Sequence, residues 1–169
     1  VGFTPLTAAL IPRQLMEILN AIFSTFDHLT QQHGLEKIKT VGDAYMVVGG
    51  LPDAIPDHAH RIGKLALAMV RVMKTLSDHI GVALEIRIGI DSGHVVAGVI
   101  GSTKFSYDLW GDVVNTASRM ESTGQGGKIQ VTERAYDLLK DHFMLEKRGH
   151  IDVKGKGKTL TYWLVEELS

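Results

Sequence analysis

The chain has 169 residues, 44% of them hydrophobic and 22% charged, which is an ordinary composition for one globular domain and excludes a disordered chain. Its 18 Lys and Arg against 19 Asp and Glu leave a formal charge of -1, so no overall field favours nucleic acid or an anionic membrane. The lack of Cys excludes disulfides, a Cys-based zinc site and a thiol nucleophile. The longest apolar run, at residues 65–70, is too short to span a bilayer, so we expect a soluble domain.

Two amphipathic helices are predicted from apolar residues that recur at helical spacing. The first covers residues 12–33 and ends before Gly34, and one of its faces is expected to lie on a sheet. The second begins after Asp57, which is predicted to cap it, and runs to about His79.

Short strands are predicted around these helices. Residues 38–41 and 44–48 read as a hairpin whose tight turn is Gly42-Asp43. Residues 84–90 alternate between apolar and other side chains and precede a Val- and Gly-rich run at 94–100. We expect these two runs to form a second hairpin with one strand buried on both faces.

The last third of the chain repeats this alternation of strands and helices. A strand is predicted near residues 129–131, a helix near 133–141, and strands near 143–146 and 160–165. Helices and hairpins in this order predict a mixed sheet with helices packed on it. The sequence shows no internal repeat and no linker, which favours a single domain.

The segment at 105–121, F-S-Y-D-L-W-G-D-V-V-N-T-A-S-R-M-E, predicts a short extended piece, a Gly turn and a helix. Asp112 stands at the helix start as a candidate cap. Asn115 and Arg119 are four residues apart and project from one helix face. Arg offers a fork of donors suited to phosphate oxygens, and Asn both donates and accepts. The pair could bind an anion formed in a reaction, or it could simply be a solvated helix face.

Four further polar features are weighed against ordinary structural roles. Asp43 is either a turn former or a ligand for a divalent metal, since Mg²⁺ prefers one or two carboxylates with substrate phosphates. Lys39 could be an ordinary exposed strand residue. Asp108 lies between aromatic neighbours, where a carboxylate is expected to have a bound partner. The basic run at 153–158, V-K-G-K-G-K, is either a solvated hairpin turn or a loop over a polyphosphate.

Five segments, in order along essentially the whole chain, resemble the catalytic domain of class III nucleotide cyclases. They are V-G-F-T at 1–4, E-K-I-K-T-V-G-D-A-Y-M-V-V-G-G-L-P at 36–52, G-H-V-V-A-G-V-I-G at 93–101, Y-D-L-W-G-D-V-V-N-T-A-S-R-M-E-S-T-G at 107–124 and R-G-H-I-D-V-K-G-K-G at 148–157. The resemblance implies an α+β sandwich with a ferredoxin-like β-α-β-β-α-β core. The resemblance also implies that residues 1–169 form one cyclase catalytic domain.

For the metal site, the resemblance implies that Asp43 binds two Mg²⁺ or Mn²⁺ ions together with a second Asp. The family pattern for that second ligand is D-I/V-V-G-F-T, which puts the Asp two places before Val1, together with the first strand of the core. We therefore expect the sequence to be trimmed inside this motif.

For the substrate, the resemblance implies that Lys39 and Asp108 select the base as they do in adenylyl cyclases, whereas guanylyl cyclases carry Glu and Cys at these places. Asn115 would orient the ribose, Arg119 would meet the α-phosphate, and Lys154 would neutralise the terminal phosphates. The implied reaction converts ATP into 3',5'-cyclic AMP and pyrophosphate. GTP is the alternative substrate, because G-D-A-Y-M-V-V-G-G-L-P is closer to guanylyl cyclases.

The resemblance also implies a head-to-tail homodimer, because metal carboxylates and substrate-binding residues come from different protomers. We expect the domain to be a cytoplasmic part of a longer protein with sensory or membrane-anchoring regions, and not to bind nucleic acid. A nucleotide-binding regulatory module that has lost catalysis is the alternative from another functional class.

Overall fold

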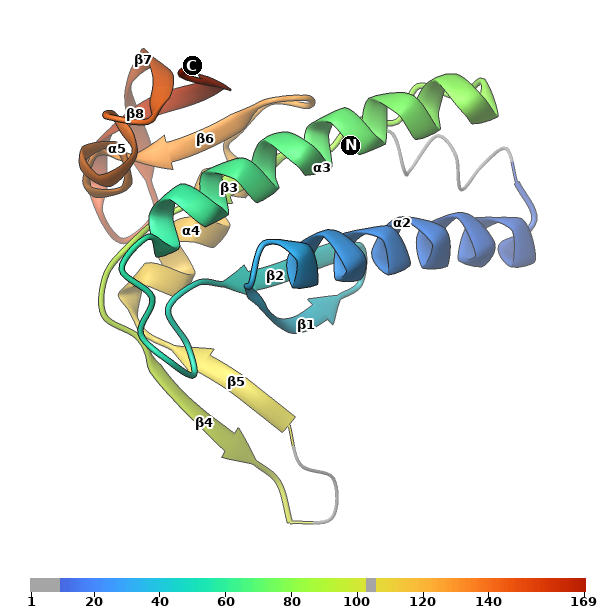
Figure 1. The fold of residues 1–169 in the computed structure, drawn as a ribbon, viewed down its shortest axis with the longest axis horizontal. Helices are drawn as coiled ribbons and strands as arrows, with labels where there is room; N and C mark the ends of the chain where they lie inside the picture. The colour runs from blue at the N-terminus through green and yellow to red at the C-terminus, as the bar shows by residue number, and fades with distance from the viewer. Residues whose placement is uncertain (1–9, 103–105) are drawn as a thin grey trace.

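The computed structural model describes residues 10–102 and 106–169, in which helices and strands alternate in an α+β arrangement (Figure 1). This part of the chain contains four α-helices and three separate sheets, of two, four and two strands. The predicted mixed sheet with packed helices is therefore confirmed. The first strand of the expected core would lie at or before residues 1–4, outside the described residues.

Helices α2 (Pro12–Gln32) and α3 (His58–Ile80) lie side by side and enclose one hydrophobic core (Figure 1). Pro12 occupies the first turn of α2, where its missing N–H costs nothing. Gly81 ends α3 in the left-handed conformation and donates its N–H to the Ser77 carbonyl. Both predicted helices are confirmed. The buried members of this core are Ile22, Phe26, Leu35, Leu65, Met69, Met73 and Leu84.

The predicted cap of α3 is wrong. Asp57 does hold the N-cap position, but its side chain caps no backbone N–H. Its carboxylate instead accepts a hydrogen bond from Arg61 Nε at 3.0 Å, one helical turn further on. A guanidinium within reach competes successfully for the carboxylate, because hydrogen bonds between two charged groups are the stronger ones.

Strands β1 (Glu36–Val41) and β2 (Ala44–Val48) form the predicted antiparallel hairpin, in which Val41 faces Ala44 across the Gly42-Asp43 turn. Gly42 has φ +60°, a conformation that glycine adopts without a steric cost. Tyr45 of β2 donates its hydroxyl proton to Asp27 of α2, at 2.6 Å. The hairpin is thereby fixed against α2, which fixes the turn that carries Asp43.

The largest sheet has the strand order β3-β6-β8-β7. Strand β3 (Ile88–Ile90) runs parallel to β6 (Ile129–Thr132), and β8 (Gly157–Glu167) pairs antiparallel with both β6 and β7 (Phe143–Val153). The short helix α5 (Glu133–Leu139) follows β6 and is capped by Thr132, whose hydroxyl accepts from Ala135 N. The strands and helix predicted here are confirmed, and β7 and β8 are longer than expected.

The predicted hairpin of residues 84–90 with 94–100 is wrong. Strand β3 pairs instead with β6, about 40 residues further along, while β4 (Val96–Ile100) pairs with β5 (Ser106–Trp110). A parallel pair needs a crossover connection, which β4, β5 and the next helix provide here. Strand β4 is largely exposed, and the strand buried along its whole length is β6.

Helix α4 (Asp112–Ser122) crosses β3 with almost no space between the two backbones. A Cβ atom added at Gly89 would come within 3.0 Å of Glu121 N and the Ala117 carbonyl oxygen. Only glycine permits this approach, so Gly89 sets how deeply α4 sits on the sheet.

No helix in the described ranges 10–102 and 106–169 is long and apolar enough to cross a membrane.

We predict that Gly89→Ala lowers the free energy of unfolding by about 1–3 kcal/mol, because a helix backbone cannot move aside as a flexible side chain does. Urea denaturation measures this loss. Gly98→Ala in β4 is the matched control, since its nearest neighbour would be a Trp110 ring atom at 3.5 Å, an ordinary contact. Equal stabilities for the two variants would contradict the packing described for α4.

Candidate functional site

Lys39 and Asp108 are 69 residues apart in the sequence and form an ion pair in the structure. Lys39 Nζ, on β1, donates to Asp108 Oδ2, on β5, at 2.7 Å. Asp108 Oδ1 accepts a second hydrogen bond from the N–H of Leu109 at 2.8 Å, and only 15% of the Asp108 side chain is exposed. The partner expected for a carboxylate in this aromatic segment is therefore Lys39.

The hydrogen bond from Lys39, followed by that from Leu109 N, holds the pKa of Asp108 below its ordinary value. Both bonds are made to the charged form of the carboxyl group. On the neighbouring strand β4, Gly98 stands opposite Asp108, so no side chain lies beside the carboxylate in the directly facing position. The pair thus presents one cationic donor and one anionic acceptor next to each other.

Helix α4 carries the predicted pair Asn115 and Arg119, and both side chains are exposed. The same helix buries Thr116 and Met120, one position further along in each case. Residues four apart lie on the same face of a helix, so Asn115 and Arg119 share an exposed face that adjoins the buried one. Among the described residues, neither the Asn115 amide nor the Arg119 guanidinium makes a hydrogen bond within the chain, so both groups are available to a ligand.

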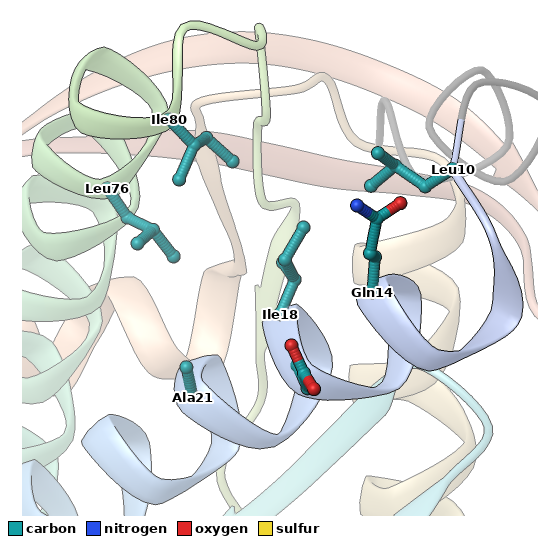
Figure 2. A pocket seen from close by; sticks show the side chains of 7 residues that line it. Leu10, Gln14, Ile18, Ala21, Leu76 and Ile80 are labelled. Carbon is teal, nitrogen blue, oxygen red and sulfur yellow. The ribbon is translucent and has the colours of Figure 1, made fainter.

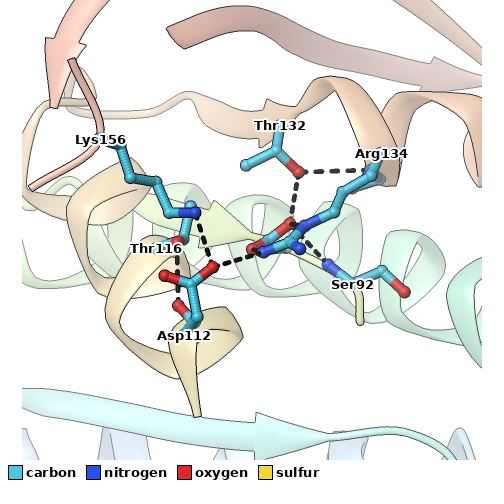
Figure 3. A network of polar contacts seen from close by, with 8 residues as sticks. Ser92, Asp112, Thr116, Thr132, Arg134 and Lys156 are labelled. Atoms are coloured by element: carbon cyan, nitrogen blue, oxygen red, sulfur yellow. Dashed lines mark hydrogen bonds and ion pairs between the residues drawn. The ribbon is translucent and has the colours of Figure 1, made fainter. Parts of the chain in front are cut away.

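The predicted capping role of Asp112 is wrong. Asp112 is the first residue of α4, Gly111 occupies the N-cap position, and no side chain caps the helix there. The Asp112 carboxylate lies instead between two cations: Lys156 Nζ at 2.6 Å and Arg134 Nη2 at 3.4 Å (Figure 3). The hydrogen bond from Lys156 is the main reason why the pKa of Asp112 is lowered.

Lys154 lies in the turn between β7 and β8 and is exposed. The run V-K-G-K-G-K forms a hairpin turn, in which Lys156 N donates to the Val153 carbonyl at 2.9 Å and Gly155 has φ +84°. The bond between Lys156 and Asp112 brings this turn to the start of α4. The structure thus connects the turn that holds Lys154 with the helix that holds Asn115 and Arg119.

Asp43 is exposed at the tip of the β1–β2 turn, on the same hairpin as Lys39. Within residues 10–102 and 106–169, no group of three or more His, Asp or Glu side chains is arranged to hold a metal ion. A single accessible carboxylate fits Mg²⁺ or Mn²⁺ as part of a site, because these ions combine one or two carboxylates with substrate phosphates and water. The second carboxylate expected before Val1 lies outside the described residues.

A groove between α2 and the end of α3 is separate from these residues (Figure 2). Its walls are mainly apolar, and none of the side chains predicted for the site lines it. The residues that line the groove are Leu10, Gln14, Glu17, Ile18, Ala21, Leu76 and Ile80.

Sequence reasoning missed the contacts of Asp91, Arg134 and Lys156. In the sequence, Asp91 lies between two predicted strands, Arg134 in a predicted helix and Lys156 in a basic run. They share no signal except their charge, which is too common to single them out. The structure shows that these side chains surround Asp112 and the end of β3.

The family model for the adenylate and guanylate cyclase catalytic domain matches residues 1–166. The chain therefore belongs to this family, and the resemblance seen in the sequence is confirmed. An adenylate cyclase of Mycobacterium tuberculosis is 50% identical over 165 residues, which cover 98% of this chain and 37% of that protein. The guanylate cyclase soluble subunit beta-2 of Rattus norvegicus is 44% identical over 171 residues, which cover 100% of this chain and 25% of that protein.

The solved structures agree on the fold. The guanylate cyclase domain of RhGC from Catenaria anguillulae, in complex with GTP, superimposes with a TM-score of 0.94 at 38% identity, covering 99% of this chain and 92% of that one. The chain thus has the α+β architecture of cyclase domain structures. It spans only about a third of the length of the M. tuberculosis relative and a quarter of the rat one.

We predict that the ion pair of Lys39 and Asp108 gives a pH-dependent contribution to stability. The folded-state pKa of Asp108 is below its unfolded value, so the contribution is fully present above the unfolded pKa of about 3.9 and is lost as the pH falls through the folded pKa. Denaturant titrations should show Asp108→Asn less stable than wild type at neutral pH, with the difference shrinking below about pH 4.

Asp53→Asn is the control for this titration, since it makes the same chemical change at an exposed carboxylate with no ion-pair partner in the described part of the chain. A wild-type advantage over Asp108→Asn that stays constant down to pH 2 would mean that the charge of Asp108 does not contribute.

Proposed function

We propose that this chain is the catalytic domain of an adenylate cyclase, which converts ATP into 3',5'-cyclic AMP and pyrophosphate. The observation that carries the proposal is the contact of Lys39 Nζ with Asp108 Oδ2 at 2.7 Å. Adenine offers ring nitrogens as acceptors and a 6-amino group as a donor, so an ammonium and a carboxylate complement it. Guanine, with its O6 acceptor and N1–H donor, requires the reverse arrangement.

In this proposal Asn115 orients the ribose, while Arg119 contacts the α-phosphate. The four-residue spacing on α4 puts both groups on one exposed face, and Arg supplies donors in the planar geometry that phosphate oxygens accept. Negative charge grows on the α-phosphate oxygens as the reaction proceeds, and a guanidinium in contact with them stabilises it more than it stabilises bound ATP. Lys154 neutralises the terminal phosphates.

The reaction is an in-line displacement at the α-phosphorus. The ribose 3'-oxygen forms a new bond to phosphorus, the bond to the β-phosphate oxygen breaks, pyrophosphate leaves, and the proton of the 3'-hydroxyl is released to solvent. We assign Asp43, together with the second Asp that the family resemblance implies, to the binding of two Mg²⁺ or Mn²⁺ ions. When bound, such ions would supply Lewis-acid chemistry, which would lower the pKa of the attacking hydroxyl and stabilise the charge of the leaving pyrophosphate.

The proposal includes a head-to-tail homodimer, in which the metal carboxylates of one protomer face the substrate-binding residues of the other. Strands β4 and β5 support it, because they extend away from the rest of the fold (Figure 1) and expose large apolar side chains. Val96 is 68%, Val99 62% and Trp110 43% exposed. Exposed apolar residues on a projecting pair of strands support an interaction surface there, and a second copy would cover it.

We predict that Asn115→Ala and Arg119→Ala each lower kcat by about 10²–10³-fold and change KM for ATP much less, because their contacts strengthen in the transition state. Cyclic AMP production by the full-length protein with Mn²⁺ and ATP measures both constants. Ser118→Ala changes another exposed residue of α4 and should leave the rate near wild type. Full activity in Arg119→Ala would remove the guanidinium from the mechanism.

We also predict that the double variant Lys39→Glu with Asp108→Cys turns over GTP better than ATP, since it reverses donor and acceptor at the base. The ratio of kcat/KM for ATP to that for GTP is the measurement, made on wild type and variant together. A wild type that prefers GTP would favour the guanylate cyclase alternative. A wild type that binds ATP without forming a cyclic nucleotide would favour the regulatory module.

A further inference from the structure

The first turn of α4 meets a chain of alternating charges (Figure 3). Asp112 Oδ2 accepts from Lys156 Nζ at 2.6 Å and lies 3.4 Å from Arg134 Nη2. Arg134 binds Asp91 in a bidentate manner, with Nε at 2.8 Å from Oδ1 and Nη2 at 2.5 Å from Oδ2. The order is therefore Lys156, Asp112, Arg134 and Asp91, with each charge next to one of opposite sign.

One end of this chain of charges is rigid. The Asp91 side chain is 0% exposed and accepts two further hydrogen bonds, from Thr132 Oγ1 at 2.6 Å and from Ser92 N at 2.8 Å. A buried carboxylate with every oxygen bonded is held in one orientation, and it orients Arg134 in turn. Asp112 thus has a fixed cation on one side.

The other end is the turn between β7 and β8. Gly155 and Gly157, which flank Lys156, both adopt positive φ, at +84° and +74°, and the neighbouring lysines are exposed. The bond from Lys156 to Asp112 is the one side-chain hydrogen bond or ion pair between this turn and α4 among the described residues.

The same hairpin also contacts the opposite end of α4. Arg148 of β7 donates to the Thr123 carbonyl at 2.7 Å and to the side chain of the buried Gln130. Gln130 Nε2 in turn donates to the Met120 carbonyl at 2.9 Å. The β7–β8 hairpin therefore supports α4 at both ends, through Arg148 at the C-terminal end and Lys156 at the N-terminal end.

We propose that Lys156 is a positioning residue, whose ion pair with Asp112 fixes the turn carrying Lys154 relative to the α4 face carrying Asn115 and Arg119. Lys154 is two residues from the contact, and Asn115 is three residues from it on the other side. This inference rests on the function proposed above and adds to it a residue that need not touch the nucleotide.

The effect should appear in turnover more than in stability. Asp112 and Lys156 are 62% and 32% exposed, and ion pairs with this exposure contribute little to folding. Misplacing a reacting or stabilising group by about 1 Å can nevertheless cost about 10²-fold in rate. Loss of the pair should thus release the turn without unfolding the domain.

The test uses two variants of the full-length protein that remove the charge but keep the size of the side chain, Lys156→Met and Asp112→Asn. Each should lower kcat with ATP and Mn²⁺ by about 10- to 100-fold and leave KM within about threefold. The double variant should lose no more kcat than the more impaired single variant, because both changes break the same ion pair. Lys156→Arg, which keeps a cation, should recover most of the rate.

Lys158→Met is the matched control, because it removes the same charge from the same hairpin at a lysine without an ion pair in the described residues. Hydrogen–deuterium exchange of residues 153–158 gives a readout that does not need activity. Exchange there should rise in Lys156→Met and Asp112→Asn but not in Lys158→Met.

Three results would overturn the inference: unchanged exchange in both variants, multiplicative losses of kcat in the double variant, or a rise in KM with constant kcat for Lys156→Met alone. The last would mean that Lys156 binds the nucleotide directly. A wild type that makes no cyclic nucleotide would overturn the proposed function instead. The exchange data alone would then show whether the ion pair of Lys156 and Asp112 fixes the turn.

Discussion

The arrangement of the candidate site depends on the direct contact of helix α4 with strand β3. Gly89 lets the two backbones approach so closely that any side chain there would collide with the helix. Thr116 and Met120 of α4 are buried, whereas Asn115 and Arg119, on the adjoining face of the helix, are exposed. A packing constraint on the buried side of a helix thus decides which polar groups its other side presents.

The formal net charge of this protein is only -1, and several charged side chains near the site are paired with groups of opposite sign. Asp108 and Asp112 each bind a lysine, and in both cases the hydrogen bond lowers the pKa of the carboxyl group. Both acids therefore remain ionised at neutral pH, and each lies beside the lysine that donates a hydrogen bond to it. In the function proposed here, one of these pairs would read the base and the other would hold a turn near the phosphates.

The errors of sequence reasoning share a physical cause. The alternation at residues 84–90 indicated a strand, of which the structure has only Ile88–Ile90. A periodic pattern shows which face of a strand is buried but not which strand is its partner, which here is β6. Asp57 and Asp112 stand where caps are common, yet each carboxylate binds a cation and neither caps a backbone N–H of its helix. Arg61 is a local neighbour, whereas Lys156 is 44 residues away and could not be foreseen.

By itself the sequence determined the long helices, the hairpin that carries Asp43, the strand-turn-helix segment and the membership of the cyclase family, because these depend on local spacing and on motifs contiguous in the chain. Only the tertiary structure decided that Lys39 meets Asp108 and that Lys156 meets Asp112. Contacts of this kind join strands and turns that are distant in sequence, and their geometry is set by the packing of the core between them.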